Sequence, residues 1–128
     1  MANGAGYFLP MNDTLFNIQS DIIRRLATQE SCNFIGRCAD VVLKNFPNVY
    51  TIFIWADWEA RVSRITKLHT IGEKEAGNLC KKMDKQRGLY YNYFTDKKWS
   101  DPYNYNLVLN STALGIDGCV NAIASLFS

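Results

Sequence analysis

The chain has 128 residues, of which 48% are apolar and 20% are charged, and its formal net charge is +2. A disordered chain combines low hydrophobicity with high net charge, so this composition excludes one and favours a single globular domain. No apolar run approaches the roughly 18–20 residues that a membrane helix needs, and residues 1–10 lack the basic start and apolar core of a signal peptide. We therefore expect a cytoplasmic protein with no membrane partner.

The sequence contains one histidine and four cysteines, which limits the metal sites that it can build. A single histidine excludes an H-E-x-x-H zinc site. No two cysteines have C-x-x-C spacing, and scattered cysteines in a cytosolic chain are usually small buried apolar side chains. We expect no metal site, and His69 at the end of a helix.

The first third of the chain predicts a helix, a strand and a short helix. Asn12 or Asp13 can cap a helix over about residues 13–29, in which apolar residues recur at helical spacing. The short run at 32–36 is the next apolar stretch and predicts a buried strand. A short helix is expected to follow through residues 41–43.

The rest of the chain continues this alternation. Almost every residue from 49 to 55 is β-branched, aromatic or otherwise apolar, which is typical of a parallel strand covered on both faces. A capped helix is predicted over 57–68, a second helix after Gly72, a third strand at 106–110 and a closing helix at 116–127. Strands that alternate with helices predict an α/β fold with a parallel sheet.

Charged and aromatic residues are distributed unevenly. Residues 61–98 contain ten Lys or Arg and four Asp or Glu, a net +6, while the remainder carries −4. A basic segment indicates an anionic partner, and it is equally typical of a solvated helical face. Seven of the 17 aromatic residues lie at 90–105, where they could stack on single-stranded nucleic acid. The helical spacing of Tyr90, Tyr91 and Phe94 favours packing instead.

Four stretches together form a specific series of motifs. They are PMNDTLF at 10–16, IGRCAD at 35–40, IFIWADWEARVSRI at 52–65 and KKMDKQRGLYYNYFTDKKWSDPYNYNLVLNSTALGIDGCV at 81–120. This series resembles the cytidylate kinase-like family of P-loop nucleotide kinases, over nearly the whole chain from Leu9 onward. The resemblance implies phosphoryl transfer from ATP, with Mg²⁺, to a nucleoside monophosphate.

The resemblance also implies a fold. We expect a partial P-loop kinase-type three-layer α/β fold, in which helices flank a short parallel sheet. Its strands would lie near 32–36, 49–55 and 106–110, and a helical lid would cover about residues 58–98.

Phosphoryl transfer requires several negative oxygens to be held together, and the planar guanidinium of arginine suits phosphate. By resemblance, Arg61 and Arg64 enter the lid that closes over ATP, and they lie on one helical face. Arg87 would reach the phosphates from the second arm of the lid. The resemblance therefore implies that Arg61, Arg64 and Arg87 are catalytic and that Asp84 binds substrate.

Other residues would bind the two nucleotides. By resemblance, Arg37 would hold the phosphate of the acceptor at the carboxyl end of the preceding strand, with Asp40 beside it. Cytidylate kinases proper carry Gly-Arg-Asp, which two residues interrupt here. Asn110, Ser111 and Thr112, which follow the last strand, would lie beside the adenine.

The family opens with a strand and a G-x-x-x-x-G-K-[ST] loop, which these 128 residues do not contain. We therefore expect residues 1–128 to form a single incomplete domain that is inactive as a kinase by itself. The strand of that loop lies in the family between those at 32–35 and 49–55. We expect these two strands to pair directly, or a second chain to fill the gap as a homodimer or complementing polypeptide.

Two alternatives remain open at this stage. The chain could be a non-enzymatic nucleotide- or RNA-binding module that uses the basic segment and the aromatic residues. It could also be half of an enzyme that another polypeptide completes. We favour the degenerate kinase-like domain, with nucleotides rather than nucleic acid as its partners.

Overall fold

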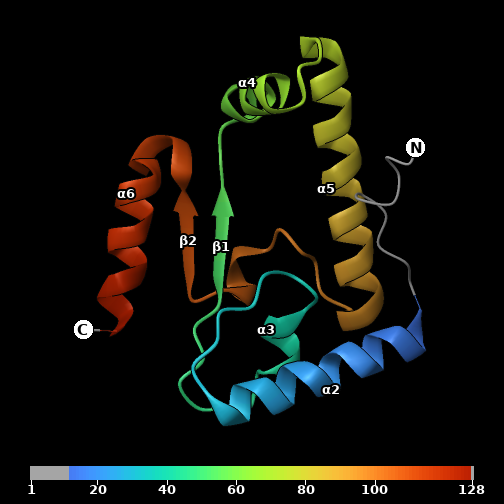
Figure 1. The fold of residues 1–128 in the computed structure, drawn as a ribbon, viewed down its shortest axis with the longest axis vertical. Coiled ribbons are helices and arrows are strands. Elements are labelled where there is room, and N and C mark those ends of the chain that lie inside the picture. The colour runs from blue at the N-terminus through green and yellow to red at the C-terminus, as the bar shows by residue number, and fades with distance from the viewer. Residues whose placement is uncertain (1–11, 128) are drawn as a thin grey trace. The chain divides into compact units, whose positions relative to one another are not determined.

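A computed structural model describes residues 12–127, which form two compact units (Figure 1). Unit 1 contains residues up to 50 and residues 85–101, and unit 2 contains residues 51–84 and the remaining C-terminal part. The long helix α5 (Glu73–Thr95) contributes its first half to unit 2 and its second half to unit 1.

Unit 1 begins with helix α2 (Asp13–Gln29), which confirms the predicted range. The side chain of Asn12 caps it, because its Oδ1 accepts a hydrogen bond from the backbone N–H of Leu15 at 3.0 Å. Buried Ile23 packs with Ala39 and Leu43, which lie in and directly after the short helix α3 (Ala39–Val42).

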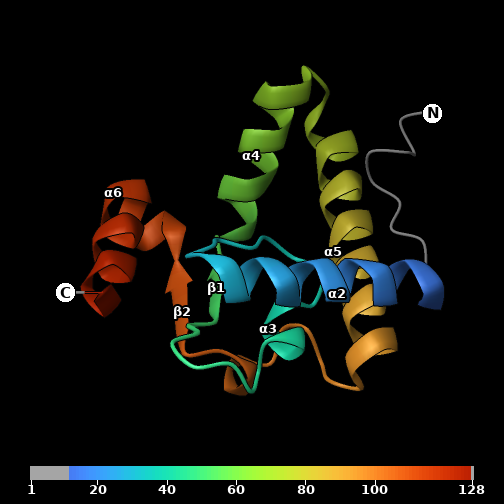
Figure 2. The same cartoon turned by 60° about the horizontal axis from the view of Figure 1, so that its bottom comes forward.

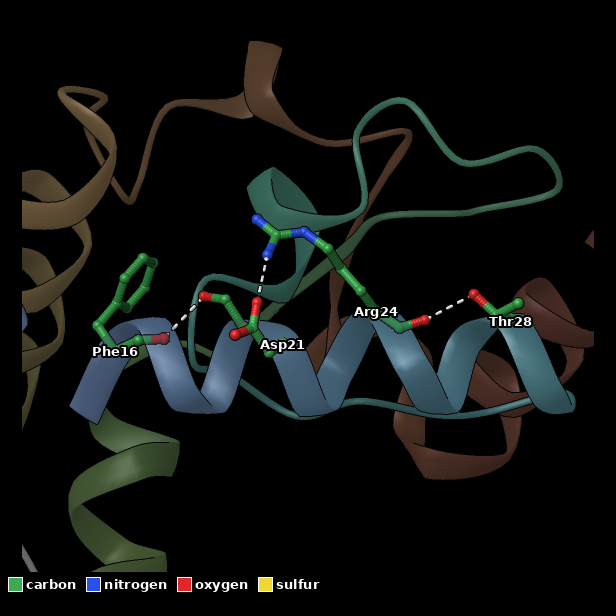
Figure 3. A network of polar contacts seen from close by, with 5 residues as sticks. Phe16, Asp21, Arg24 and Thr28 are labelled. Atoms are coloured by element: carbon green, nitrogen blue, oxygen red, sulfur yellow. Dashed lines mark hydrogen bonds and ion pairs between the residues drawn. The ribbon is translucent and has the colours of Figure 1, made fainter. Parts of the chain in front are cut away.

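Hydrogen bonds and an ion pair between neighbouring turns hold α2 locally (Figure 3). Arg24 pairs with Asp21 at 3.2 Å, and its carbonyl accepts a hydrogen bond from the Thr28 hydroxyl at 2.8 Å. The hydroxyl of Ser20 donates to the carbonyl of Phe16 at 2.8 Å. Such short-range contacts contribute only a few tenths of a kcal/mol each.

The predicted strand at 32–36 is wrong. The segment pairs with no strand in the described part of the chain, and Ile35 is 90% exposed. Gly36, Arg37 and Cys38 then take positive φ angles of 73°, 59° and 59°, which turn the chain directly into α3. The only strand pairing within residues 12–127 joins residues 52–55 to residues 107–110, so the expected direct pairing of 32–35 with 49–55 is also wrong.

Unit 2 contains the sheet, which has two parallel strands, β1 (Ile52–Trp55) and β2 (Leu107–Asn110) (Figure 1). Ile52 aligns with Leu107 and Trp55 with Asn110. The first strand is shorter than predicted, because it begins at Ile52 and not at residue 49. Directly before it, the backbone N–H of Thr51 donates a hydrogen bond to Oδ1 of Asn106 at 2.9 Å. The fold is therefore α/β and mostly helical, with a short parallel sheet flanked by helices.

Helices α4 (Trp58–His69) and α5 follow β1 in the predicted order, and His69 lies at the end of α4 as expected. Within unit 2 they pack through Val62, Cys80 and Ala76, which is fully buried. Both views show α4 beside the first half of α5 (Figures 1 and 2). These helices occupy much of the region predicted to be the lid.

The C-terminal part of unit 2 contains the short 3-10 helix η1 (Pro102–Asn104), helix α6 (Ser111–Ala124) and the 3-10 turn η2 (Ser125–Phe127). Helix α6 begins five residues earlier than predicted, and it is interrupted at Gly115, whose φ of 72° is not helical. Glycine tolerates this left-handed angle without a steric cost. No helix in the described range has both the length and the apolar character for a membrane span.

Candidate nucleotide-binding site

Arg37 lies in an exposed left-handed turn of unit 1. The prediction that it follows a strand is wrong, because residues 31–35 form no strand. Two consecutive non-glycine residues, Arg37 and Cys38, have φ near 59°. This conformation is unfavourable for side chains with a Cβ, and such residues cluster at functional sites. The turn presents the guanidinium of Arg37 to solvent, 6.0 Å from the centroid of the Tyr90 ring.

Asp40 lies three residues later, in the first turn of α3, and is half-buried. Its Oδ2 accepts a short hydrogen bond of 2.6 Å from the hydroxyl of Tyr91. Hydrogen bonds to an ionised acceptor are shorter and stronger than neutral ones. The structure thus brings a cationic and an anionic predicted site residue, Arg37 and Asp40, into one turn.

Aromatic side chains support this turn from within unit 1. Buried Cys38, Tyr90 and Tyr91 form a cluster, against which Phe16 and Phe94 pack. The predicted packing role of the aromatic residues is therefore confirmed for these positions. The pKa of Tyr90 is raised by burial and then by nearby Cys38, and its hydroxyl lies 3.3 Å from Gln19 Oε1.

The cysteines do not supply a nucleophile to the turn. Burial, followed by the charge of Asp40, raises the pKa of the Cys38 thiol to about 12. This thiol stays protonated at neutral pH, and the thiolate is the reactive form. Cys80 and Cys119 are also buried, as predicted, but Cys32 is exposed.

The second group of predicted residues lies in unit 2, between α4 and the first half of α5. The guanidinium of Arg61 binds the Asp84 carboxylate with two hydrogen bonds of 2.9 and 2.6 Å. The two side chains are 29% and 33% exposed. The hydrogen bond to Asp84 is the main cause that raises the pKa of Arg61. Two residues predicted for different roles are therefore direct partners.

Trp58 adds a further feature to this ion pair. Arg61 Cζ lies 5.7 Å from the centroid of the Trp58 ring, and Lys81 Nζ lies 5.9 Å from it. Cations within about 6 Å of an aromatic face are attracted by the ring quadrupole. Two cationic side chains, Arg61 from α4 and Lys81 from α5, therefore lie near the Trp58 ring.

The other two predicted arginines lie on α4 and α5. Arg64 is exposed on α4, and its side chain has no ion pair or hydrogen bond within residues 12–127. Arg87 lies on α5, three residues after Asp84, in the part of the helix that belongs to unit 1. The structure brings Arg61 to Asp84 and places Arg64 on the same helix without a partner in that range.

The three residues predicted beside the adenine join the ends of the two strands. Asn110 Oδ1 caps α6 by accepting from the backbone N–H groups of Thr112 and Ala113. The Thr112 hydroxyl accepts from the backbone N–H of Asp57 at 2.9 Å, and the Ser111 hydroxyl donates to the carbonyl of Trp55 at 3.1 Å. The observed contacts of Asn110, Ser111 and Thr112 are therefore structural.

The sequence reasoning missed Tyr91 as a partner of Asp40 and Trp58 as a partner of Arg61. The repeated tyrosine at 90–91 was visible, but its hydroxyl bond reaches across 51 positions of the chain. Trp58 is the first residue of α4 and lies three positions before Arg61, a spacing that puts both side chains on one helical face and that the sequence could have shown. The contact between Tyr91 and Asp40, by contrast, joins α5 to α3, so no local pattern reveals it.

The chain is similar to a known protein family and to a solved structure. A search of curated proteins gives no match. A crystal structure of an uncharacterized protein from Eubacterium ventriosum is 32% identical and superposes with a TM-score of 0.85. The match covers 92% of this chain and 66% of that one, so the chain spans just under two thirds of its length. The model of the cytidylate kinase-like family matches residues 2–113. The chain belongs to the cytidylate kinase-like family.

Proposed function

We propose that the chain binds nucleotides and takes part in phosphoryl transfer from ATP to a nucleoside monophosphate. The observation that carries this proposal is the turn that presents Arg37 beside Asp40 in unit 1. An exposed guanidinium binds phosphate oxygens through its fork of donors, and a carboxylate accepts hydrogen bonds from a base or a ribose. Family membership supports the same assignment.

Arg61, Arg64 and Arg87 are proposed to contact the phosphates that pass between the two nucleotides. Phosphoryl transfer depends on positioning and charge stabilisation more than on covalent chemistry with the protein. Arg61 uses two of its nitrogens for Asp84, and a guanidinium has five N–H donors. The remaining donors of Arg61 and the exposed side chain of Arg64 supply positive charge on α4.

ATP and its Mg²⁺ are proposed to enter as substrate. Within the described residues, no three or more His, Cys, Asp or Glu side chains gather into a metal-binding set. We therefore propose that the ion enters on the phosphate oxygens of ATP, which are among the ligands of Mg²⁺ in kinase sites together with water and one or two carboxylates.

We propose that residues 1–128 do not complete the transfer unaided. The 128-residue sequence contains no G-x-x-x-x-G-K-[ST] motif, whose backbone N–H groups and lysine would hold the ATP phosphates. Incubation of the purified chain with ATP and CMP is expected to give no ADP above a no-protein blank. Steady turnover would overturn this part of the proposal.

Replacing Arg37 with alanine is expected to weaken binding of CMP by about 10- to 100-fold, because it removes a charged hydrogen bond to phosphate. Isothermal titration calorimetry with CMP measures the effect. Arg24→Ala is the matched control, because Arg24 is an exposed arginine of the same unit that pairs with Asp21. Equal affinities for the two variants would contradict the phosphate role of Arg37.

RNA binding is the weaker candidate, because the aromatic residues that would stack on bases are largely packed. Tyr90 and Tyr91 are both buried. If RNA were the partner, the affinity would fall steeply with salt as counterions are released. Tight binding of a single-stranded oligonucleotide with such a slope, and no CMP binding, would favour RNA.

We also propose that a second copy of the chain covers the sheet of unit 2. In the described part of the chain the sheet has two strands, and Ile54, Trp55 and Val108 are exposed on it. Parallel sheets normally lie covered on both faces, and isolated two-stranded sheets are marginally stable. Light scattering after size exclusion is expected to give a dimer, and Val108→Lys a monomer. A wild-type monomer at all concentrations would contradict this.

A further inference from the structure

We propose that the Asp84 carboxylate occupies an anion site on Arg61 and Lys81, and that a phosphate group must displace it to bind there. This inference rests on the proposed function, in which Arg61 contacts nucleotide phosphates, and it adds an internal competitor to that contact. Arg61 lies on α4, Lys81 and Asp84 lie on α5, and all three belong to unit 2.

The Asp84 carboxylate binds Arg61 in the geometry that a phosphate would use. Nη1 of Arg61 donates to Oδ2 at 2.9 Å, and Nη2 donates to Oδ1 at 2.6 Å. Arginine binds carboxylate and phosphate through the same fork of two parallel hydrogen bonds. The fork of Arg61 is therefore filled, and a phosphate at its remaining donors would lie beside a negative carboxylate.

The Trp58 ring keeps the two cations together when the carboxylate leaves. Cζ of Arg61 lies 5.7 Å from the ring centroid, and Nζ of Lys81 lies 5.9 Å from it. The ring itself lies against α5, because a Cβ added at Gly77 would be 3.6 Å from Cζ2 of Trp58. The attraction between a cation and an aromatic face does not require Asp84. We therefore expect the guanidinium and the ammonium to stay near one ring after the anion is exchanged.

The ion pair is open to exchange because it is only partly buried. The side chains of Arg61 and Asp84 are 29% and 33% exposed. Lys81 is exposed, and its side chain has no ion pair within residues 12–127. A ligand that binds only the unpaired form has an apparent affinity reduced by the fraction of that form. Asp84 therefore lowers the affinity of the two cations for phosphate without touching the ligand.

Asp84→Asn is the variant that tests this competition, because it keeps the size of the side chain and removes its charge. We expect it to tighten binding of inorganic triphosphate by about three- to tenfold. The gain is smaller than the full strength of a charged hydrogen bond, because the pair is partly solvated. Asp117→Asn is the matched control, since Asp117 is an exposed carboxylate on α6 of the same unit. It changes the net charge equally and is expected to change the affinity by less than about twofold.

Calorimetric titration with inorganic triphosphate measures these affinities, and two further comparisons locate the site. Adding Asp84→Asn to Arg61→Ala is expected to give no more than the small gain of Asp117→Asn, because the competition needs the guanidinium. Adding Lys81→Ala to Asp84→Asn is expected to weaken binding by about two- to fivefold. Lys74→Ala, at another exposed lysine of α5 in unit 2, is the control for Lys81→Ala and should change the affinity by less than about twofold.

The wild-type chain supplies a readout that needs no substitution. The ¹³Cγ chemical shift of Asp84 should move when triphosphate is added, because its carboxylate then loses the two hydrogen bonds from Arg61. The same shift of Asp117 should stay in place. An Asp84 shift that does not move when triphosphate saturates the chain would show that the carboxylate is not displaced.

The outcomes separate this inference from the proposed function. Equal triphosphate affinities of wild type and Asp84→Asn overturn the competition, and so does a gain that survives Arg61→Ala. The absence of triphosphate binding in both wild type and Asp84→Asn overturns it as well, and an affinity unchanged by Lys81→Ala overturns the part assigned to Lys81. A wild-type chain that binds triphosphate but neither ATP nor CMP overturns the proposed function and leaves the anion exchange at Arg61 standing.

Discussion

Replacing Phe94 with alanine is expected to lower the free energy of unfolding by about 2–4 kcal/mol, since Phe-to-Ala changes in packed cores cost up to about 5 kcal/mol and this ring is half-buried. Phe94 stacks on Phe16 with centroids 4.1 Å apart, and it meets Tyr90 edge-to-face at 4.9 Å. Phe94→Ala therefore removes the contacts of this ring with Phe16 and Tyr90 and leaves their faces without a packing partner there. Urea denaturation followed by far-ultraviolet circular dichroism measures the change.

Leu89→Ala is the matched control for Phe94→Ala. Leu89 lies on the same helix, five positions earlier, and is 47% exposed. Because its side chain is already largely in water, we expect a loss of about 1 kcal/mol or less. If both variants unfold at the same urea concentration, the aromatic cluster does not stabilise unit 1 as proposed.

Local patterns in the sequence were sufficient for most of the fold. Periodic apolar residues and caps located α2, α4 and α5, since helical hydrogen bonds join residues close in the chain. The apolar runs of β1 and β2 were recognised because β-branched, aromatic and other apolar residues follow one another almost without interruption. The expected cover on both faces is not seen within the described residues, since Ile54, Trp55 and Val108 are exposed.

Other features depend on contacts that no local pattern records. The segment at 32–36 has a strand-like composition, but a strand also needs a hydrogen-bonding neighbour. The left-handed angles of Arg37 and Cys38 belong to residue types that rarely adopt them. Neither property could be inferred from the identities of the residues alone.

In the candidate site, too, residue types could be predicted from the sequence but contacts between distant residues could not. The residue types expected to bind phosphate were identified by resemblance, but their partners were not. Asp84 was assigned to substrate, and the structure binds it to Arg61, 23 positions away. The resemblance implies that Asn110 lies beside the adenine, and in the structure its Oδ1 caps α6 while its Nδ2 donates to Asp57 Oδ1 at 3.2 Å. A side chain's neighbours follow from the packing of helices and strands, which the sequence does not state directly.

The Arg61–Asp84 ion pair links α4 to the first half of α5, so it stabilises the helix pair. The same ion pair occupies two guanidinium nitrogens of Arg61. A bidentate, partly desolvated pair is stronger than an ordinary surface pair. Breaking it by removing one partner also leaves the other charge without compensation. Nucleotide phosphates that bind Arg61 would therefore compete with Asp84 for the same guanidinium.

Asp84→Ala is accordingly expected to lower the free energy of unfolding by about 1–3 kcal/mol. Breaking a fully buried ion pair costs roughly 3–5 kcal/mol, and we expect less here because each partner is about a third exposed. Urea denaturation followed by tryptophan fluorescence measures it, since the Trp58 ring lies 5.7 Å from Arg61. Arg64→Ala, on the same helix and exposed, should change stability by no more than about 0.5 kcal/mol. The double variant Arg61→Ala with Asp84→Ala should lose less than the two single losses added together, because the single variants each leave an unpaired charge. Additive losses would show that the two side chains do not stabilise the helix pair jointly.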